Sequence, residues 1–165
     1  VKNFNENIKD LTCLKINKFI FDEIIKIKPS KVFISGFWNN TDLDEIKKII
    51  DKLMKNDIKN VYLVGPSPRW HDPLPKILLK KYRISKIIPR YLYDKNHIKN
   101  FELDAKFREF AKNNSLKYLS PIKALCKEDL TCLVKVGEGS NSITNWDENH
   151  FTKKASIFIF SKFID

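Results

Sequence analysis

The stretch KVFISGFW, residues 31–38, decides the fold class that we expect. It is a short apolar run between the polar sequences KPS and NNTD, which is the pattern of a strand buried on both faces. A second such run, NVYLVGPSPRW at 60–70, ends its strand at Gly65 and Pro66, and LKYLSP at 116–121 predicts a third strand. Strands buried on both faces belong to parallel sheets covered by helices.

Helical patterns separate these strands. We expect helices in five segments: 14–27, 43–54, 73–82, 97–113 and 153–163. The alternation predicts one α/β domain with a parallel sheet over residues 1–165, without an internal boundary. Because loops at the carboxyl ends of parallel strands carry the sites of such domains, we expect Gly36, Gly65 and Ser120 to begin site-forming loops.

Composition narrows the class of protein. The 165 residues are 42% hydrophobic, which is enough for a folded core, and no apolar stretch approaches the length that spans a bilayer. The net charge of +11 invites a nucleic-acid partner, but the lysines are scattered over every segment, as on a solvated surface, and no nucleic-acid module is present. The N-terminus is polar rather than signal-like, and it begins with Val, so we expect a piece of a longer protein.

The three cysteines are Cys13, Cys126 and Cys132. The last two stand in LCKEDLTCL, where a local disulfide would suit an oxidising compartment such as a periplasm. The alternative is a pair of ordinary thiols in a reducing cytosol. Neither a second cysteine pair nor a suitably spaced histidine pair completes a zinc site, so no metal is expected.

The segment NWDENHFTKKAS, residues 145–156, offers a candidate catalytic pair. An Asp147 that accepts a hydrogen bond from one nitrogen of His150 would fix the tautomer and leave the other nitrogen free as a general base. Thr152 is a natural N-cap for the last helix. The spacing alone is weak, because DKNH at 94–97 repeats it; we interpret His97 there as a residue at a helix start with a solvated neighbour.

Four features along the chain support a family resemblance: a strand ending in SGFW, a strand ending in LVGPSP, the segment YLSPIKALC, and DENHFT before the last helix. In this order they resemble the SGNH domain at the C-terminus of bacterial acyltransferase-3 membrane proteins, O-acetyltransferases that modify cell-surface polysaccharides. The resemblance runs from about Cys13 to the end of the chain. It implies a three-layer α/β/α, flavodoxin-like sandwich with a parallel sheet, in the periplasm or on the extracytoplasmic face of the membrane.

The resemblance also assigns roles to residues. It makes His150 the general base and Asp147 its orienting partner. Gly36 would line the site. Trp38 stands where the wider family pattern expects an Asn, and Asn39 lies beside it. Trp38 and Asn39 are therefore candidates for the oxyanion hole or for the site lining. The implied partners are an acetylated donor, a polysaccharide acceptor and an N-terminal transmembrane acyltransferase domain; no cofactor is implied.

The serine nucleophile of the family is missing. Its G-D-S motif does not occur in the 165 residues. We interpret Ser140, in GEGSNS, as part of a turn and Ser67 as a loop residue, and we expect the nucleophile upstream of Val1. The sheet would then lack its first strands. The free edge of the 31–38 strand would make the chain marginally stable, or would pair two copies into a dimer.

Three functions remain open at this stage. The first is an SGNH-type acyltransfer domain that lacks its serine block. The second is a catalytically inactive basic module that binds an anionic glycan or a membrane surface, and the third is a nucleic-acid-binding α/β domain. Three tryptophans near the expected site loops either stack on a sugar or close the core: Trp38, Trp70 and Trp146. His71 has no partner that the sequence identifies, and we interpret it as a loop residue.

Overall fold

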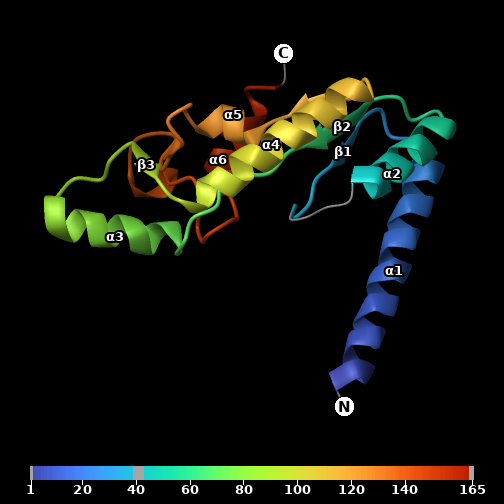
Figure 1. Ribbon diagram of the computed structural model, residues 1–165, viewed down its shortest axis with the longest axis horizontal. Coiled ribbons are helices and arrows are strands. Elements are labelled where there is room, and N and C mark those ends of the chain that lie inside the picture. The colour runs from blue at the N-terminus through green and yellow to red at the C-terminus, as the bar shows by residue number, and fades with distance from the viewer. Residues whose placement is uncertain (1, 39–42, 164–165) are drawn as a thin grey trace. The chain divides into compact units, whose positions relative to one another are not determined.

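Three short strands form the central parallel sheet of the computed structural model, which describes residues 2–38 and 43–163 (Figure 1). The strands are β1 (Val32–Ile34), β2 (Val61–Val64) and β4 (Lys117–Leu119), in the order β1-β2-β4. The expected α/β class with a parallel sheet is therefore confirmed. Within the described residues β1 is an edge strand, as expected; pairing of two copies through that edge stays a prediction.

Helices flank the sheet, and their bounds follow the sequence patterns except at the start of the first helix and at the ends of the third and the last. They are α1 (Lys2–Ile27), α2 (Leu43–Lys55), α3 (Leu74–Ser85), α4 (Asn96–Asn113), α5 (Pro121–Leu125) and α6 (Lys153–Phe160). The first helix begins well before residue 14, and the last ends three residues before 163, where a hydrogen-bonded turn replaces it. The five-residue helix α5 escaped prediction, because Ser120 caps it and Pro121 starts it within a segment that we assigned to a strand end.

The chain divides into two compact units. One comprises residues 1–33 and 42–62, and the other comprises 34–41 and 63–165. In the first unit, α2 turns Ile46, Ile50 and Leu53 inward, so its predicted amphipathic face is buried. All the site residues discussed below belong to the second unit.

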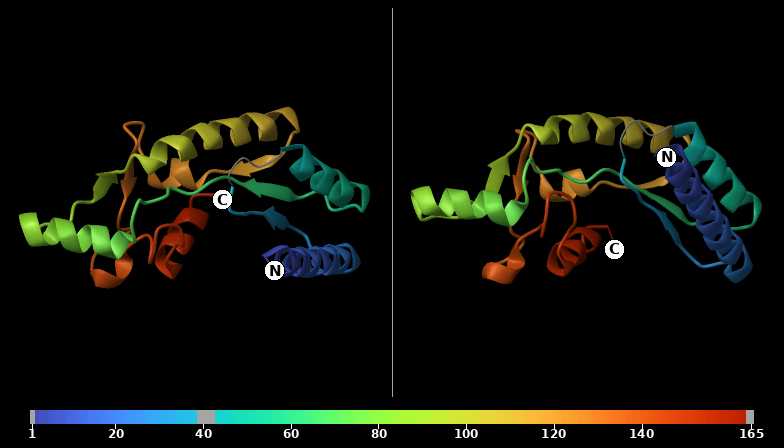
Figure 2. Two further views of the ribbon diagram at one scale, coloured as in Figure 1. Left: turned by 60° about the horizontal axis from the view of Figure 1, so that its bottom comes forward. Right: turned by 90° about the horizontal axis from the view of Figure 1, so that it is seen from below.

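The second unit contains a second sheet that the sequence did not predict. Strands β3 (Tyr91–Tyr93) and β5 (Thr131–Leu133) pair antiparallel, with Leu92 opposite Cys132, and Figure 2 shows them side by side. A disulfide joins Cys126 to Cys132, which confirms the local bridge. These two strands form by pairing with each other across a long stretch of chain, which a local pattern does not reveal.

The core of the second unit lies between these strands and the helices α3 and α6. One buried cluster gathers Trp70, Leu74, Ile77, Leu78, Cys132 and Val134. A neighbouring cluster joins Leu125, Leu133 and Ile159. The disulfide cysteine and Trp70 thus share one cluster, which fixes the loop before α3 against β5.

One glycine marks a close approach at the end of β2. A Cβ on Gly65 would overlap the Tyr118 hydroxyl, while the Gly65 N–H donates to the Leu119 carbonyl at 2.8 Å. Only a residue without a side chain fits there.

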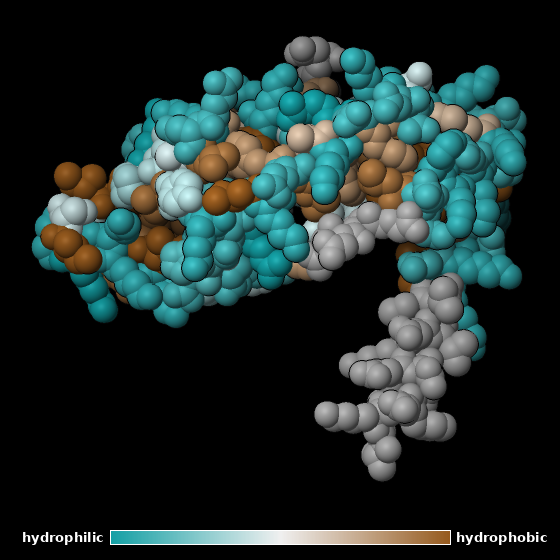
Figure 3. Space-filling view, viewed as in Figure 1, coloured by the Kyte–Doolittle hydropathy of each residue, from teal (hydrophilic) through white to brown (hydrophobic). Residues whose placement is uncertain are grey.

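The exposed surface is mainly hydrophilic on the face shown in Figure 3, in agreement with scattered, solvated lysines. Hydrophobic side chains gather on this face around α3 (Figure 3). Ile84 is 86% exposed and Ile87 is 66% exposed.

Candidate active site

The loop that carries the expected Asp–His pair is closed by its own backbone. The Trp146 N–H donates to the His150 carbonyl at 3.1 Å, and Asn145 pairs with Phe151 in an isolated antiparallel bridge. Thr152 follows as the predicted N-cap of α6, since its hydroxyl accepts a hydrogen bond from the Ala155 N–H. The loop is therefore a closed turn on the N-terminus of a helix, which holds its side chains in place.

Asp147 and His150 form a direct pair. The Nδ1 atom of His150 lies 2.6 Å from Oδ2 of Asp147, and Oδ1 accepts the backbone N–H groups of Asn149 and His150 at 2.8 and 2.7 Å. Partial burial acts to raise the pKa of Asp147, but these three hydrogen bonds outweigh it and lower the pKa to about 2. The carboxylate is thus ionised at neutral pH and fixes the imidazole tautomer.

The His150 ring is open to solvent on its other side. Its side chain is 67% exposed, and it stacks on Trp146 with ring centroids 5.1 Å apart. The part of the chain that the structure describes offers the Nε2 atom no hydrogen-bond partner. That nitrogen is free to take a proton, as a general base requires.

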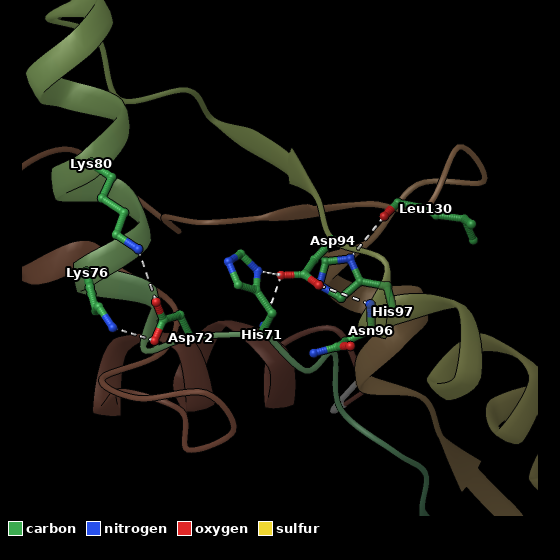
Figure 4. Close-up of polar contacts among 8 residues, drawn as sticks. All are labelled: His71, Asp72, Lys76, Lys80, Asp94, Asn96, His97 and Leu130. Carbon is green, nitrogen blue, oxygen red and sulfur yellow. Dashed lines mark hydrogen bonds and ion pairs between the residues drawn. The ribbon is translucent and has the colours of Figure 1, made fainter.

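A second Asp–His pair lies in the same unit, and sequence reasoning missed it. The Nδ1 atom of His71 is 2.5 Å from Oδ2 of Asp94, which also accepts the His71 backbone N–H at 3.0 Å (Figure 4). His71 does lie in a loop, as interpreted, but it has a partner that the sequence did not identify. No local signal pointed to Asp94, because it follows β3 and is 23 residues away in sequence.

Asp94 itself is buried rather than solvated, which corrects a second expectation. It is 4% exposed, and its Oδ1 accepts the Asn96 N–H at 3.0 Å in the first turn of α4. Burial acts to raise the pKa of Asp94, but the hydrogen bonds from Asn96 and from His71 hold it below its ordinary value. The carboxylate serves two elements at once, the start of α4 and the loop before α3.

His97 is also buried, and it does not pair with Asp94 through its side chain. The ring is fully buried: Nδ1 lies 3.1 Å from the Leu130 carbonyl, and the ring meets Trp70 edge-on at 4.7 Å between centroids (Figure 4 labels His97 and Leu130). Burial lowers the pKa of His97 and favours the neutral ring. The repeated D-x-x-H spacing at 94–97 therefore belongs to core packing.

The two loops that carry His71 and His150 are hydrogen-bonded to each other. The Trp70 N–H donates to the Glu148 carbonyl at 3.0 Å, and the Leu74 N–H donates to the Asp147 carbonyl at 3.3 Å. The buried Trp70 indole N–H also donates to Oδ1 of Asn145 at 3.2 Å. Trp70 thus belongs to the core and ties the two loops together.

A cavity of about 500 Å³ opens beside these loops. Gly36 and Trp38 both line it, together with Ser67 and His71. The Trp38 indole N–H donates to the Val64 carbonyl at 2.8 Å, so this ring forms a wall of the cavity and its donor is engaged. The expectation for Asn39 lies outside the described residues.

Ser120 does not line this cavity, contrary to expectation. Ser120 is buried, and its hydroxyl donates to Oδ1 of Asp104 at 2.6 Å. The Oγ atom of Ser120 also accepts a hydrogen bond from the Lys123 N–H, as the N-cap of α5. Its two hydrogen bonds commit the hydroxyl to the structure of the β4–α5 turn.

The serines that we interpreted as turn or loop residues lie in such positions. Ser140 opens a short 3-10 helix (Ser140–Ser142) after Gly139, whose φ of 87° favours glycine. The Ser67 carbonyl accepts the Asn100 amide at 2.5 Å. Among the described residues, no serine hydroxyl bonds to His150. The described residues also contain no cluster of three or more His, Cys, Asp or Glu side chains of the kind that holds a metal.

A parallel α/β domain with a tautomer-fixing Asp–His pair just before its last helix is typical of esterase-like acyl-transfer domains. A protein-family model described as the SGNH domain fused to AT3 domains matches residues 2–165, and the chain therefore belongs to that family. This confirms the resemblance inferred from the motifs.

A solved structure agrees with this assignment. The periplasmic domain of the lipopolysaccharide acetyltransferase of Salmonella ser. Paratyphi A is 28% identical to this chain and superposes with a TM-score of 0.78. The match covers 90% of this chain and 60% of that one, so this chain spans less than two thirds of that structure. No curated protein matches the chain. None of the described helices is both long enough and apolar enough to cross a membrane.

Proposed function

We propose that the chain is the acyl-transfer domain of an O-acyltransferase that moves an acetyl group onto hydroxyls of a cell-surface polysaccharide. One observation carries this proposal: Nδ1 of His150 is held at 2.6 Å by the ionised Asp147, while Nε2 has no hydrogen-bond partner among the described residues. Membership of the SGNH family, and similarity to a lipopolysaccharide acetyltransferase domain, support the acyl-transfer chemistry.

In the proposed reaction, His150 moves protons at Nε2. It takes the proton of a serine hydroxyl while the serine oxygen attacks the acetyl carbonyl of the donor, and it then gives that proton to the departing oxygen or sulfur of the donor. A sugar hydroxyl next loses its proton to Nε2 and attacks the carbonyl carbon of the acetyl-serine. The bond from that carbon to the serine oxygen breaks, and Nε2 gives its proton to that oxygen, which regenerates the serine and leaves the acetylated sugar. Asp147 stabilises the imidazolium that forms in each step.

The serine of this reaction is proposed to lie outside these 165 residues. The sequence contains no G-D-S motif, and within the described residues no serine hydroxyl bonds to His150. The proposal places the serine in a segment N-terminal to this chain, on a strand that would extend the sheet beyond β1.

The proposed location is the periplasmic or extracytoplasmic side of a membrane, with a membrane-embedded AT3 domain as partner in the full protein. The local disulfide between Cys126 and Cys132 fits an oxidising compartment, and the similar solved structure is a periplasmic domain. The acceptor would be reached in that compartment.

A second function is favoured by the cations around the cavity, namely glycan binding without catalysis. In that case the basic surface would hold an anionic glycan, and the Asp–His pair would only stabilise its loop. Binding that persists in His150→Ala, with no acetyl transfer in the natural protein, would favour it.

Acetyl transfer by the natural protein that carries both this domain and its G-D-S serine tests the proposal. His150→Ala is expected to abolish transfer, while the Lys76→Ala control on α3 retains it. The 165-residue chain alone should show negligible turnover of a simple acetyl ester. His150-dependent turnover by that chain would contradict the external serine and would require another nucleophile.

A further inference from the structure

The cavity beside the two loops is cationic. Arg69, Lys95 and Lys99 line it, and among the described residues that line it Glu148 is the sole carboxylate. No described carboxylate lies within ion-pair distance of Lys95 or Lys99. Two ammonium groups, one turn apart at the start of α4, thus line the cavity without an ion-pair partner among the described residues.

One other pair of lysines with the same spacing is neutralised. Lys76 and Lys80 on α3 both lie close to the Asp72 carboxylate, at 2.8 and 3.3 Å (Figure 4). The absence of a described partner thus distinguishes Lys95 and Lys99 from this otherwise similar pair. An anion that enters the cavity would be attracted by the ammonium groups of Lys95 and Lys99.

His71 adds a directional hydrogen-bonding group to the same wall. The buried Asp94 holds its Nδ1 at 2.5 Å and its backbone N–H at 3.0 Å, so in the neutral ring Nδ1 carries the proton and Nε2 is an acceptor (Figure 4). The side chain is 54% exposed although its carboxylate partner is almost completely buried. The buried carboxylate orients the half-exposed ring, so that its Nε2 atom can accept a hydrogen bond from a hydroxyl group of a ligand.

An exposed aromatic ring completes the surface. Phe37 lines the cavity and is 61% exposed, with the Arg69 guanidinium 4.9 Å from its ring centroid. Aromatic faces pack against the C–H groups of sugar rings, while polar side chains bind their hydroxyls. The cavity thus combines cations, an acceptor nitrogen and an apolar ring.

We propose that this cavity is the acceptor subsite of the domain and that it takes a pyranose unit bearing a negative charge. Lys95 and Lys99 bind the anionic group, Nε2 of His71 accepts a hydrogen bond from a ring hydroxyl, and Phe37 packs against the ring. The anionic group is a carboxylate of a uronate or a phosphate substituent. This inference rests on the proposed function, because it identifies the class of sugar that would receive the acetyl group.

Calorimetric binding to the 165-residue chain tests the inference with three probes: trigalacturonate, mannose 6-phosphate and neutral maltotriose. At least one charged probe should bind about tenfold more tightly than maltotriose. Lys95→Ala/Lys99→Ala should remove that advantage, whereas Lys76→Ala/Lys80→Ala, which removes the same charge at the same spacing, should change affinity by less than about twofold. The preferred charged probe distinguishes a uronate from a phosphorylated sugar.

His71→Ala provides an independent variant that leaves the cavity charge intact. It should weaken the preferred charged probe about fivefold, with the fold checked by circular dichroism. If His71→Ala unfolds the chain, the two lysine pairs still decide the question. Equal losses in the two lysine pairs, or equal binding of charged and neutral probes, would overturn the proposal.

The outcome is separable from that of the proposed function. Loss of acetyl transfer in His150→Ala, together with full affinity in the Lys95→Ala/Lys99→Ala variant, overturns this inference alone. Selective loss of glycan binding in that lysine variant, together with acetyl transfer that does not need His150, supports the subsite and overturns the proposed mechanism.

Discussion

The two Asp–His pairs of this domain share a hydrogen-bond geometry but differ in burial. In both, Nδ1 of the histidine contacts a carboxylate oxygen, at 2.6 Å for His150 and 2.5 Å for His71. The Asp147 side chain is 21% exposed and lies three residues from its histidine, whereas the Asp94 side chain is 2% exposed and comes from another element. The difference teaches that the same kind of pair can stand on an open loop, where we propose that it reacts, or can anchor a side chain in a cavity wall.

The largest expected effect separates the two histidines by kinetics. In the natural protein, His150→Ala should lower kcat for acetyl transfer by about 10³-fold or more, because no other group then takes the serine proton. His71→Ala should mainly raise the acceptor KM, by about fivefold, since it removes a binding contact. Steady-state kinetics over a range of acceptor concentrations measures both. A kcat loss for His71→Ala as large as that for His150→Ala would break the comparison.

Asp147→Asn should produce the next largest effect. The amide cannot hold the imidazole in the correct tautomer or stabilise the imidazolium, so kcat should fall by about 10²- to 10⁴-fold while the acceptor KM changes little. The measurement is the same kinetic assay, with the fold confirmed by circular dichroism. Activity within about threefold of the parent protein would show that Asp147 only shapes the loop.

Asp94→Asn should mainly cost stability. Its carboxylate is buried and accepts hydrogen bonds from His71 and Asn96. In the asparagine variant an amide NH₂ replaces one of these oxygens, so it faces an N–H donor of His71 or Asn96 and that hydrogen bond is lost. We expect a loss of about 1–3 kcal/mol in the free energy of unfolding. Urea denaturation measures it, with Asp147→Asn as the matched control in the more exposed pair. A larger loss in Asp147→Asn would reverse the assignment of anchor and reactive pair.

The smallest effect is in the pH dependence of stability. The pKa of Asp147 is lowered from its ordinary value of 3.8 to about 2, so its contribution is fully present above about pH 4 and is lost as the pH falls towards 2. The difference in Tm between the parent chain and Asp147→Asn should therefore shrink over that interval. Asp94 also has a lowered pKa and also loses its contribution to stability as the pH falls. Both proteins contain Asp94, so its contribution cancels in the difference between their Tm values. A constant difference from pH 5 to pH 2 would contradict the lowered pKa.

The sequence predicted those features that depend on neighbouring residues. The apolar run at 31–38 and the amphipathic pattern of α2 predicted the α/β class. The D-x-x-H spacing predicted the Asp147–His150 pair, whose two side chains are hydrogen-bonded within one loop. The local disulfide was predictable for the same reason, since its cysteines are six residues apart. Each of these features arises within a single segment of the chain.

The features that the sequence did not predict depend on distant contacts. The partner of His71 comes from after β3, and β3 is itself three residues long and formed by pairing with β5. The same D-x-x-H spacing gives a hydrogen-bonded pair at 147–150 but not at 94–97. At 94–97, tertiary packing buries His97 against Trp70 and turns Asp94 towards His71. Local spacing could not distinguish the two, since burial decided between them.

Acetyl-enzyme formation tests the central claim most directly. The natural protein, mixed with a radiolabelled acetyl donor and no acceptor, should trap label on its serine, and His150→Ala should slow that single-turnover step by about 10³-fold while His71→Ala slows it by no more than about threefold. The account predicts this contrast because His71 would act only when an acceptor is bound. Rapid labelling in His150→Ala would contradict the assignment of His150 as the base.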